Sequence, residues 1–314
     1  MKYIFVINPA AGQVKARSFW LPKIQQLVKE KEIDYELHNT LSFQEGINYV
    51  RQRCESGEVI RFYGCGGDGT LNCLVNGAFG YPNASIGVLP TGTGNDFVRS
   101  FSDPEGFRDL ERQLEGEVRV LDAIRCTDPS GTRIALNMCN IGVDAAVAEV
   151  AGEMKKKPLL SGAMAYGAAA VKVLAGQIGF PARVQIDDEE PYDQDFLFIA
   201  IGNGAYCGVG FHSTPLSKLD DGLMDACLVK NITRRKIATV IMKYRAGTHL
   251  TDKACEGLVT YRKCRKLRIT PLRPYDEHVE RMALDGEGSG FLDTTFEVDP
   301  SSIKFIVPQG CELL

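Results

Sequence analysis

Residues 59–78 read VIRFYGCGGDGTLNCLVNGA, and this stretch decides the fold. Val59 to Tyr63 form a short apolar run, which predicts a buried strand. The glycines that follow let the backbone turn tightly and approach a ligand closely, and Leu71 to Ala78 then shows helical spacing. A strand, a glycine loop and a helix in this order predict an α/β unit built on a parallel sheet.

The same alternation extends to both sides of this stretch. Predicted strands lie at Tyr3 to Ile7, Tyr35 to His38, Ser85 to Leu89 and Val118 to Arg125. Helical spacing separates the first three strands, and a capping box at Ser42-Phe-Gln-Glu45 predicts a helix start. We therefore expect a parallel sheet with helices on both faces in the first part of the chain.

The second part of the chain shows a different pattern. Short strand-like segments dominate, and the clearest helical pattern runs from Arg234 to Arg245. The predicted strands are Ile134 to Ile141, Ala182 to Ile186, Phe196 to Ile201, Met224 to Val229, Lys266 to Thr270, His278 to Leu284, Thr295 to Val298 and Ile303 to Val307. Several alternate apolar with polar residues, which predicts a mainly antiparallel sheet.

Composition and charge exclude several classes of protein. The chain has 314 residues, 44% of them apolar, and a net charge of −4, so no nucleic-acid partner is expected. Ten cysteines include no C-x-x-C pair, which excludes a zinc site by spacing and indicates reduced, cytoplasmic thiols. Only Leu159 to Phe180 approaches the length of a membrane span, and Lys172 and Gln177 interrupt it. We expect no signal peptide and no transmembrane segment.

Three small-residue loops each follow a predicted strand of the first part. They are NPAAG at 8–12, GCGGDGT at 64–70 and PTGTGND at 90–96. In a parallel sheet these loops emerge at one edge, where ligands bind, and Thr70 opens a helix whose free N–H groups attract anions. Asp68 and Asp96 cannot bind phosphate directly, so we expect them to hold Mg²⁺ or its water against a nucleotide.

Other interpretations of these loops remain open at this point. A single Asp-Gly pair is most often only a turn. The loops match neither the P-loop pattern G-x-x-x-x-G-K-[ST] nor the dinucleotide pattern G-x-G-x-x-G with a later acidic residue.

Five motifs, in order, resemble the diacylglycerol kinase catalytic domain, which the bacterial soluble lipid kinases and the sphingosine kinases share. They are Asn8-Pro-x-x-Gly12, Gly66-Gly-Asp-Gly-Thr70, Gly92-Thr-Gly-Asn-Asp-Phe97, Lys218-Leu-Asp-Asp-Gly-Leu-Met-Asp225 and Leu284-Asp-Gly-Glu287. The resemblance covers nearly the whole chain. It implies an α/β nucleotide-binding domain at 1–123 and a mainly antiparallel β-sandwich domain for the lipid substrate at 124–299, with residues 300–314 returning to the first domain.

The resemblance also implies an activity. It predicts that the γ-phosphate of ATP is transferred to the hydroxyl of diacylglycerol or a related lipid alcohol, with Mg²⁺, as a step of phospholipid biosynthesis. The implied nucleotide-binding residues are Asn8, Thr40, Gly64, Cys65, Gly66, Gly67, Asp68, Gly69, Thr70 and Thr93.

The remaining roles follow from the same resemblance. Asp68, Asp96 and Asp122 would form an acidic network around Mg²⁺ and its water, and Lys218, Asp221 and Leu223 would hold a structural Mg²⁺. Glu287 would be the general base, supported by Asp285. Without the resemblance, Asp285-Gly-Glu287 is typical of an exposed hairpin turn, and the Gly288-Ser-Gly290 that follows departs from the expected apolar continuation.

Two alternatives to a lipid kinase stay open: a kinase acting on NAD, since NAD kinases also carry Gly-Gly-Asp-Gly-Thr, and a nucleotide or lipid sensor without catalysis. The basic runs Lys155 to Lys157 and Arg262 to Lys266 predict peripheral association with a membrane that carries the lipid substrate. A homodimer is also possible. The acceptor lipid is not specified by any motif.

Overall fold

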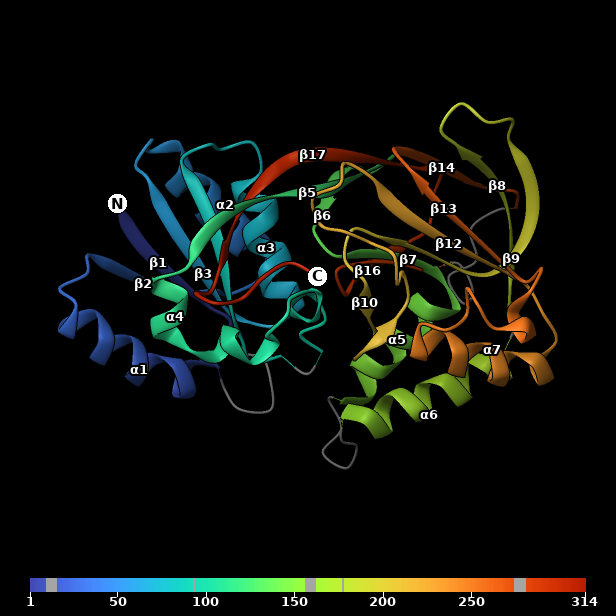
Figure 1. Cartoon of the computed structure of the whole chain (residues 1–314), viewed down its shortest axis with the longest axis horizontal. Helices are drawn as coiled ribbons and strands as arrows, with labels where there is room; N and C mark the ends of the chain where they lie inside the picture. Colours follow the sequence, from blue (N-terminus) through green and yellow to red (C-terminus); the bar gives the residue numbers. More distant parts are fainter. Residues whose placement is uncertain (10–15, 93, 156–161, 177, 274–280) are drawn as a thin grey trace. The chain divides into compact units, whose positions relative to one another are not determined.

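The computed structural model describes residues 1–9, 16–92, 94–155, 162–176, 178–273 and 281–314. Its contacts divide the chain into two compact units (Figure 1). Unit 1 comprises Met1–Ala123, Leu219–Asp221 and Asp299–Leu314, and unit 2 comprises Ile124–Lys218 and Gly222–Val298. Two long strands, β5 (Glu117–Asp128) and β17 (Thr294–Val307), each contribute residues to both units.

Unit 1 is built on a parallel sheet with strand order β2-β1-β3-β4-β17. Its strands are β1 (Lys2–Ile7), β2 (Tyr35–Asn39), β3 (Ile60–Gly66) and β4 (Ala84–Pro90). β17 joins the sheet next to β4 through Phe305, which pairs with Ile86, and β5 pairs with β17. The predicted parallel α/β architecture is confirmed.

Helices cover both faces of this sheet (Figure 1). Their bounds are α1 (Ala16–Glu30), α2 (Phe43–Glu55), α3 (Asp68–Ala78) and α4 (Leu110–Leu114), with 3₁₀ turns η1 (Phe97–Ser100) and η2 (Pro104–Arg108). On one face α1 and α4 pack on β1 and β3 around Trp20, which is fully buried. Elsewhere α2 packs against α3, where a side chain at Gly77 would lie 2.6 Å from Cβ of Val50.

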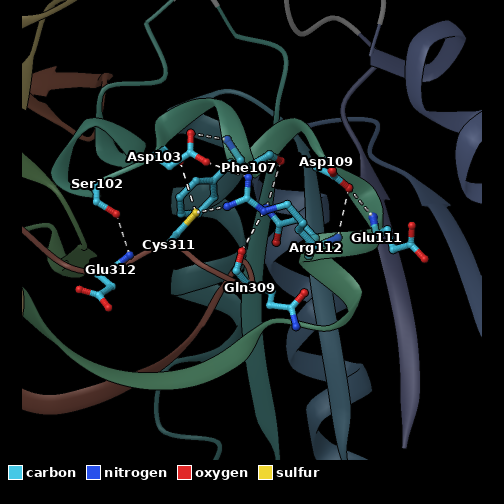
Figure 2. A network of polar contacts seen from close by, with 11 residues as sticks. Ser102, Asp103, Phe107, Asp109, Glu111, Arg112, Gln309, Cys311 and Glu312 are labelled. Atoms are coloured by element: carbon cyan, nitrogen blue, oxygen red, sulfur yellow. Dashed lines mark hydrogen bonds and ion pairs between the residues drawn. The ribbon is translucent and has the colours of Figure 1, made fainter.

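The C-terminal residues are held in unit 1 by Arg112 of α4 (Figure 2). Its Nε donates to the carbonyl of Gln309 at 2.8 Å, its Nη1 to the carboxylate of Asp103 at 2.8 Å, and its Nη2 to Sγ of Cys311 at 3.4 Å. The hydrogen bond from Arg112 lowers the pKa of Asp103 below its ordinary value. Ser102 extends the attachment, because its N–H donates to the carbonyl of Glu312 at 2.9 Å.

Unit 2 is an antiparallel structure with helices on one side (Figure 1). Its strands are β6 (Gly131–Ala135), β7 (Met138–Gly142), β8 (Phe180–Ile186), β9 (Tyr192–Gly202), β10 (Tyr206–Cys207), β11 (Phe211–His212), β12 (Met224–Lys230), β13 (Val259–Cys264), β14 (Lys266–Pro271), β15 (Arg281–Leu284) and β16 (Glu287–Gly290). Its helices are α5 (Val143–Lys155), α6 (Gly162–Ala175) and α7 (Arg234–Ala246), with the 3₁₀ turn η3 (Lys253–Cys255).

From Phe196 onward the long strand β9 is buried on both faces, which organises the core of unit 2. Phe196, Ile199 and Ile201 belong to a core cluster shared with β8, β12 and β14. Phe198 and Ala200 belong to a second cluster, which contains Ile237, Val240 and Tyr244 of α7. The predicted mainly antiparallel second domain is therefore confirmed.

Four predicted strands differ from the structure. Ile134 to Ile141 is not one strand, because β6 ends at Ala135 and β7 starts at Met138. Thr295 to Val298 and Ile303 to Val307 are not two strands, because β17 runs through both. The strand at Val59 to Tyr63 runs on to Gly66, since Gly64 and Gly66 are held in register with Val88 and Pro90 of β4. Helix α5 and strand β13 were not predicted.

All ten cysteines are buried and free, as expected for small apolar residues. Among the helices of the described residues, none is both long and apolar enough to cross a membrane.

Candidate functional site

The ends of four parallel strands meet at one edge of the unit 1 sheet, as the sequence predicts. The N–H of Asn8, just after β1, donates to the carbonyl of Cys65 in β3 at 3.2 Å. The N–H of Thr40, just after β2, donates to the carbonyl of Ile7 at 2.9 Å. The N–H of Thr91, just after β4, donates to the carbonyl of Gly66 at 2.8 Å. Asn8, Thr40, Gly66 and Thr91 therefore form one continuous rim.

Two glycines of this rim touch through their backbones. A Cβ added to Gly92 would lie 2.6 Å from Cα of Gly67, and one added to Gly67 would lie 3.1 Å from Cα of Gly92. Real Cβ atoms do not approach backbone to 2.6 Å, so position 92 requires glycine, whereas a Cβ at position 67 would need the neighbouring loop to shift by a few tenths of an ångström. The contact holds the loop after β3 against the loop after β4, so the backbone of both loops can approach a ligand closely.

Two carboxylates gather at the same loops. A Cβ added to Gly94 would lie 3.0 Å from Oδ2 of Asp96 and 3.1 Å from Oδ2 of Asp68, so both carboxylates lie beside one glycine. Asp68 also accepts a hydrogen bond from the N–H of Phe97 at 3.3 Å. Asp96 is 6% exposed and lies 3.3 Å from Nε of Arg99. These are hard oxygen ligands of the kind that Mg²⁺ prefers.

Buried hydroxyls complete the rim. Oγ1 of Thr70 and Oγ1 of Thr91 are both buried. Within the described part of the chain, neither oxygen has a hydrogen-bond partner. Thr70 lies in the first turn of α3, whose N-cap, Gly67, has no side chain to cap the free N–H groups. A helix start of this kind binds anions, and unpartnered hydroxyls beside it fit the oxygens of a phosphate.

Not every predicted nucleotide-binding residue reaches this rim with its side chain. Cys65 lies within β3, and its fully buried side chain belongs to the unit 1 core, where burial raises the pKa of the thiol. Gly64 also lies inside β3. Thr93 lies outside the described residues. The residues predicted from the sequence do not include Thr91 and Gly92, although the motif that starts at Pro90 contains both.

The third member of the predicted acidic network has a separate environment. Asp122 is buried, its Oδ1 accepts the N–H of Ser301 at 2.7 Å, and its own N–H donates to the carbonyl of Leu219 at 2.7 Å. Within the described ranges, no three His, Cys, Asp or Glu side chains lie close enough together to hold a metal ion. In the described residues Asp122 therefore forms no compact metal cluster with Asp68 and Asp96, and its part in a network through Mg²⁺ and water stays a prediction.

The loop predicted to hold a structural Mg²⁺ lies between β11 and β12. Lys218 and Asp221 are exposed, and Gly222 has a φ of +72°, so the segment makes a turn before β12. Leu223 is half-buried directly before that strand. The donors are carbonyls and one carboxylate, which is oxygen chemistry that suits Mg²⁺.

The predicted catalytic turn is a tight hairpin in unit 2. Leu284 of β15 pairs with Glu287 of β16, which leaves Asp285 and Gly286 as a two-residue loop. Their φ values of +47° and +88° are those of a type I′ turn. Glu287 is exposed at the start of β16, and partial desolvation raises its pKa above the ordinary value.

Asp285 faces inward from this hairpin. It is 6% exposed, and its carboxylate accepts the N–H groups of Leu136 at 2.8 Å, Asn137 at 3.0 Å and Met138 at 2.8 Å. These three bonds fall where β6 stops and β7 starts, so Asp285 ends one strand and begins the next. The expected exposed turn is therefore correct for Glu287 and wrong for Asp285.

Unit 2 also contains an apolar cavity of about 230 Å³ among α5, α6 and α7, which sequence reasoning did not find. Val143, Phe198 and Ile241 form apolar walls, and Asp144 and Arg245 add charge. Oδ2 of Asp144 lies 3.5 Å from Oη of Tyr244, and Tyr244 is buried against the sheet. Apolar walls with a small number of polar groups are typical of a ligand site.

Comparison with known proteins agrees with this division of the chain. The model of the diacylglycerol kinase catalytic domain matches residues 2–126, and the model of the YegS C-terminal NAD kinase β-sandwich-like domain matches residues 137–307. A "Probable lipid kinase YegS-like" of Shewanella frigidimarina is 32% identical over 79% of this chain and 77% of its own. A protein of the same description from Chromohalobacter salexigens is 26% identical over 96% of this chain and 94% of its own.

Solved structures show the same fold. A diacylglycerol kinase of Bacillus anthracis is 19% identical, with a TM-score of 0.67 over 98% of this chain and 97% of its own. Yeast NADH kinase is 10% identical, with a TM-score of 0.52 over 99% of this chain and 84% of its own.

A parallel α/β unit with a glycine rim and an antiparallel β unit make up the class of fold that diacylglycerol kinases and NAD kinases share. Within that class, this chain belongs to the diacylglycerol kinase catalytic-domain family and is a relative of the YegS-like lipid kinases.

Proposed function

We propose that this protein transfers the γ-phosphate of ATP to the hydroxyl of diacylglycerol or a related lipid alcohol. The observation that carries the proposal is the rim of unit 1, where the Gly67–Gly92 contact, the unpartnered hydroxyls of Thr70 and Thr91 and the Asp68–Asp96 pair lie together. Phosphoryl transfer requires mainly positioning and neutralisation of charge, and these groups supply both.

Asp68 and Asp96 are assigned to Mg²⁺. Mg²⁺ is usually held by one or two carboxylates together with the phosphates of its substrate, which fits a pair of carboxylates beside Gly94. Bound there, the ion would neutralise charge on the phosphates of ATP. The rim itself orients the triphosphate through backbone N–H groups and the two threonine hydroxyls.

Glu287 is assigned as the general base. Its exposed carboxylate can accept the proton of the acceptor hydroxyl as the oxygen forms its bond to phosphorus and the bond to ADP breaks. The raised pKa makes Glu287 a stronger base than an ordinary carboxylate. Asp285 is a positioning residue, because its carboxylate is used by the N–H groups of residues 136–138.

The cavity among α5, α6 and α7 is assigned to an apolar chain of the acceptor. Its volume of about 230 Å³ is too small for a whole lipid and suits part of a hydrocarbon chain. Ala170 lines it, so Ala170→Phe should fill it. We expect this variant to raise the KM for a long-chain acceptor and to leave the affinity for MgATP unchanged.

The test is a phosphorylation assay with labelled ATP against a panel of lipid alcohols in mixed micelles, with NAD as a separate arm. Label in a lipid, lost in Asp68→Asn and in Glu287→Gln, supports the proposal. Label in NAD alone would replace it with a kinase acting on that nucleotide, and ATP binding without turnover on any acceptor would replace it with a sensor.

A further inference from the structure

Strand β16, which begins with Glu287, gains little stability from its own side chains. Among the strands of the described residues it pairs with β15 alone. Two of its four residues are Gly288 and Gly290, and in the described part of the chain nothing lies within 4 Å of a Cβ added at Gly288. Side-chain pairs across strands stabilise a sheet, so a strand with so few of them needs another contact to fix the position of Glu287.

Ser289 makes such a contact. Nη2 of Arg133, in β6, donates to Oγ of Ser289 at 3.0 Å. Ser289 and Glu287 are two residues apart in one strand, so their side chains leave the same face of β16. The hydrogen bond from Arg133 therefore holds the face of β16 from which the carboxylate of Glu287 projects.

This contact lies at the rim of the apolar core of unit 2. Ser289 pairs with Met282 across the β15–β16 hairpin, and Arg133 pairs with Cys126 across the β5–β6 hairpin. Paired residues share one face of a sheet, and Met282 and Cys126 belong to the same core cluster. Both hairpins thus direct a polar side chain toward one apolar interior, where a hydrogen bond is stronger than in open water.

Arg133 is itself anchored in the β5–β6 hairpin. Its Nη2 also donates to Oδ2 of Asp128 at 3.3 Å, and the side chain of Asp128 is only 3% exposed. The carboxylate is fixed by the turn between the two strands, because Oδ1 accepts the N–H of Ser130 at 2.7 Å. A carboxylate removed from water keeps its cation close, since separation would leave a buried charge without a partner. The hairpin therefore presents an oriented donor to β16.

The same contact explains why Gly288-Ser-Gly290 departs from the apolar continuation expected after Glu287. An apolar side chain at position 289 could not accept the hydrogen bond from Arg133. The second N–H of Nη2 would then lose its partner at the rim of the core, which costs free energy. The hydroxyl of Ser289 is the acceptor that Arg133 requires.

We propose that Arg133, acting through Ser289, is a positioning residue for Glu287. The proposal rests on the proposed function and deepens it, because it names what fixes the general base of that same site. Asp285 holds the turn before β16 through the N–H groups of residues 136–138. Arg133 holds the strand after the turn. Glu287 lies between these two attachments.

The test compares the turnover of Ser289→Ala with that of Thr132→Ala. We expect Ser289→Ala to lower kcat about tenfold, which is part of the loss that a displacement of about 1 Å in a catalytic site can cause. The KM for MgATP should stay unchanged. The acid limb of the pH profile should also stay in place, because the base is displaced and not lost. Ser289→Thr, which keeps the hydroxyl, should recover most of the rate.

Thr132→Ala is the matched control. Thr132 is adjacent to Arg133 in β6, and its hydroxyl makes an exposed hydrogen bond of 3.1 Å with that of Thr127 across the same hairpin. Successive residues of a strand point to opposite faces, so this bond lies on the face away from Ser289. The control should keep the wild-type kcat. Equal kcat values for Ser289→Ala and Thr132→Ala would overturn the proposal.

A double-mutant cycle tests whether Arg133 acts through Ser289. Arg133→Gln should lower kcat at least as much as Ser289→Ala does, and the two changes together should lower it no further than Arg133→Gln alone. Two effects that multiply in full would show that Arg133 acts elsewhere and would overturn the proposal. Ser289→Ala keeps the pair of Arg133 with Asp128, so its loss of rate cannot come from an unpaired buried charge.

Hydrogen exchange gives a measurement that needs no turnover. In Ser289→Ala the N–H groups of residues 287–290 should exchange faster than in wild type, and those of β14 should be unchanged. A wild-type protein that phosphorylates no acceptor would overturn the proposed function. An active protein in which Ser289→Ala changes neither kcat nor exchange would overturn the positioning role alone.

Discussion

Single residues determine the geometry of the unit 1 rim, and Gly92 is the clearest example. Its Cα is packed against Cα of Gly67, so no side chain fits between the loops after β3 and β4. Position 92 requires a residue without a side chain, and the sequence shows this only as a glycine within a motif. The structure shows which glycine is irreplaceable and why.

Gly92→Ala should separate the two loops. The new methyl would lie 2.6 Å from Cα of Gly67, which is backbone and cannot give way as a side chain can. We expect kcat/KM for MgATP to fall about 100-fold, as a misplacement of about 1 Å in a catalytic site can cause. Gly152→Ala is the control, since nothing lies within 4 Å of a Cβ there. Equal activity of the two variants would remove the rim from the site.

The pH dependence of turnover should report Glu287. Because desolvation raises its pKa, the acid limb of the kcat/KM profile should lie above pH 4.5. Below this limb the base is protonated and the rate falls. Glu287→Gln should lower the rate about 10²- to 10⁴-fold and abolish the limb.

Replacement of Glu287 should not lower the stability of the fold, although it lowers the rate. A raised pKa means that the folded state favours protonated Glu287, so ionisation at neutral pH destabilises the fold. Glu287→Gln should therefore unfold at the same urea concentration as wild type or a higher one at pH 7. A large loss of stability would show that the variant is inactive because it does not fold.

Among the elements of unit 2, a buried carboxylate holds the β15–β16 hairpin, which we propose carries the general base. Asp285 accepts three N–H groups at the junction of β6 and β7, so β15, β16 and β7 depend on one side chain. The contact explains why the apolar run from Ile134 to Ile141 is not one strand. Asp285 is 149 residues from Leu136 along the chain, so no local pattern could predict the break.

Asp285→Asn should destabilise unit 2 by about 2 kcal/mol, because one oxygen is replaced by an N–H₂ group that cannot accept a hydrogen bond from backbone. Asp187→Asn is the matched control. Asp187 also has a positive φ and accepts the N–H groups of Arg265 and Lys266, yet it is exposed and water can replace it. Urea midpoints measure the stability of both variants. Equal shifts of the two midpoints would show that the burial of Asp285 does not matter.

The C-terminal residues depend on Arg112 in the same way. Arg112→Lys keeps the charge and loses the fork that reaches Asp103, Gln309 and Cys311 together. We expect faster hydrogen exchange at the N–H groups of Ser102 and Leu314, which bond across this attachment. Because Arg112 lowers the pKa of Asp103, its contribution is present above pH 3.8 and is lost as the pH falls further. Unchanged hydrogen exchange in Arg112→Lys would show that backbone hydrogen bonds alone hold the C-terminal residues.

At the scale of the whole molecule, the sequence predicted the parallel sheet of unit 1 and the antiparallel character of unit 2. It predicted these because strand, loop and helix patterns are local. Apolar runs such as Tyr3 to Ile7 and the capping residue Ser42, whose Oγ accepts the N–H of Glu45 at 3.2 Å, are contained within a few residues.

What the sequence could not predict depends on distant contacts. The Asp-Pro-Ser-Ser segment at 299–302 has the composition of a turn, yet β17 continues through it because Asp122 binds the N–H of Ser301, which has a φ of +52°. The cavity among α5, α6 and α7 is likewise lined by residues from several segments that lie far apart in the sequence. The motifs located the rim, and only the structure shows that Oδ1 of Asp122 accepts the N–H of Ser301.

The two units are interleaved along the chain, which limits the segments that recombination between genes can exchange. The chain passes between them after Ala123, Lys218, Asp221 and Val298, so neither unit is encoded by one uninterrupted stretch of gene. Recombination that swapped residues 1–123 alone would import a sheet without the part of β17 that completes it. Neither unit can therefore be exchanged as a single uninterrupted segment of the chain.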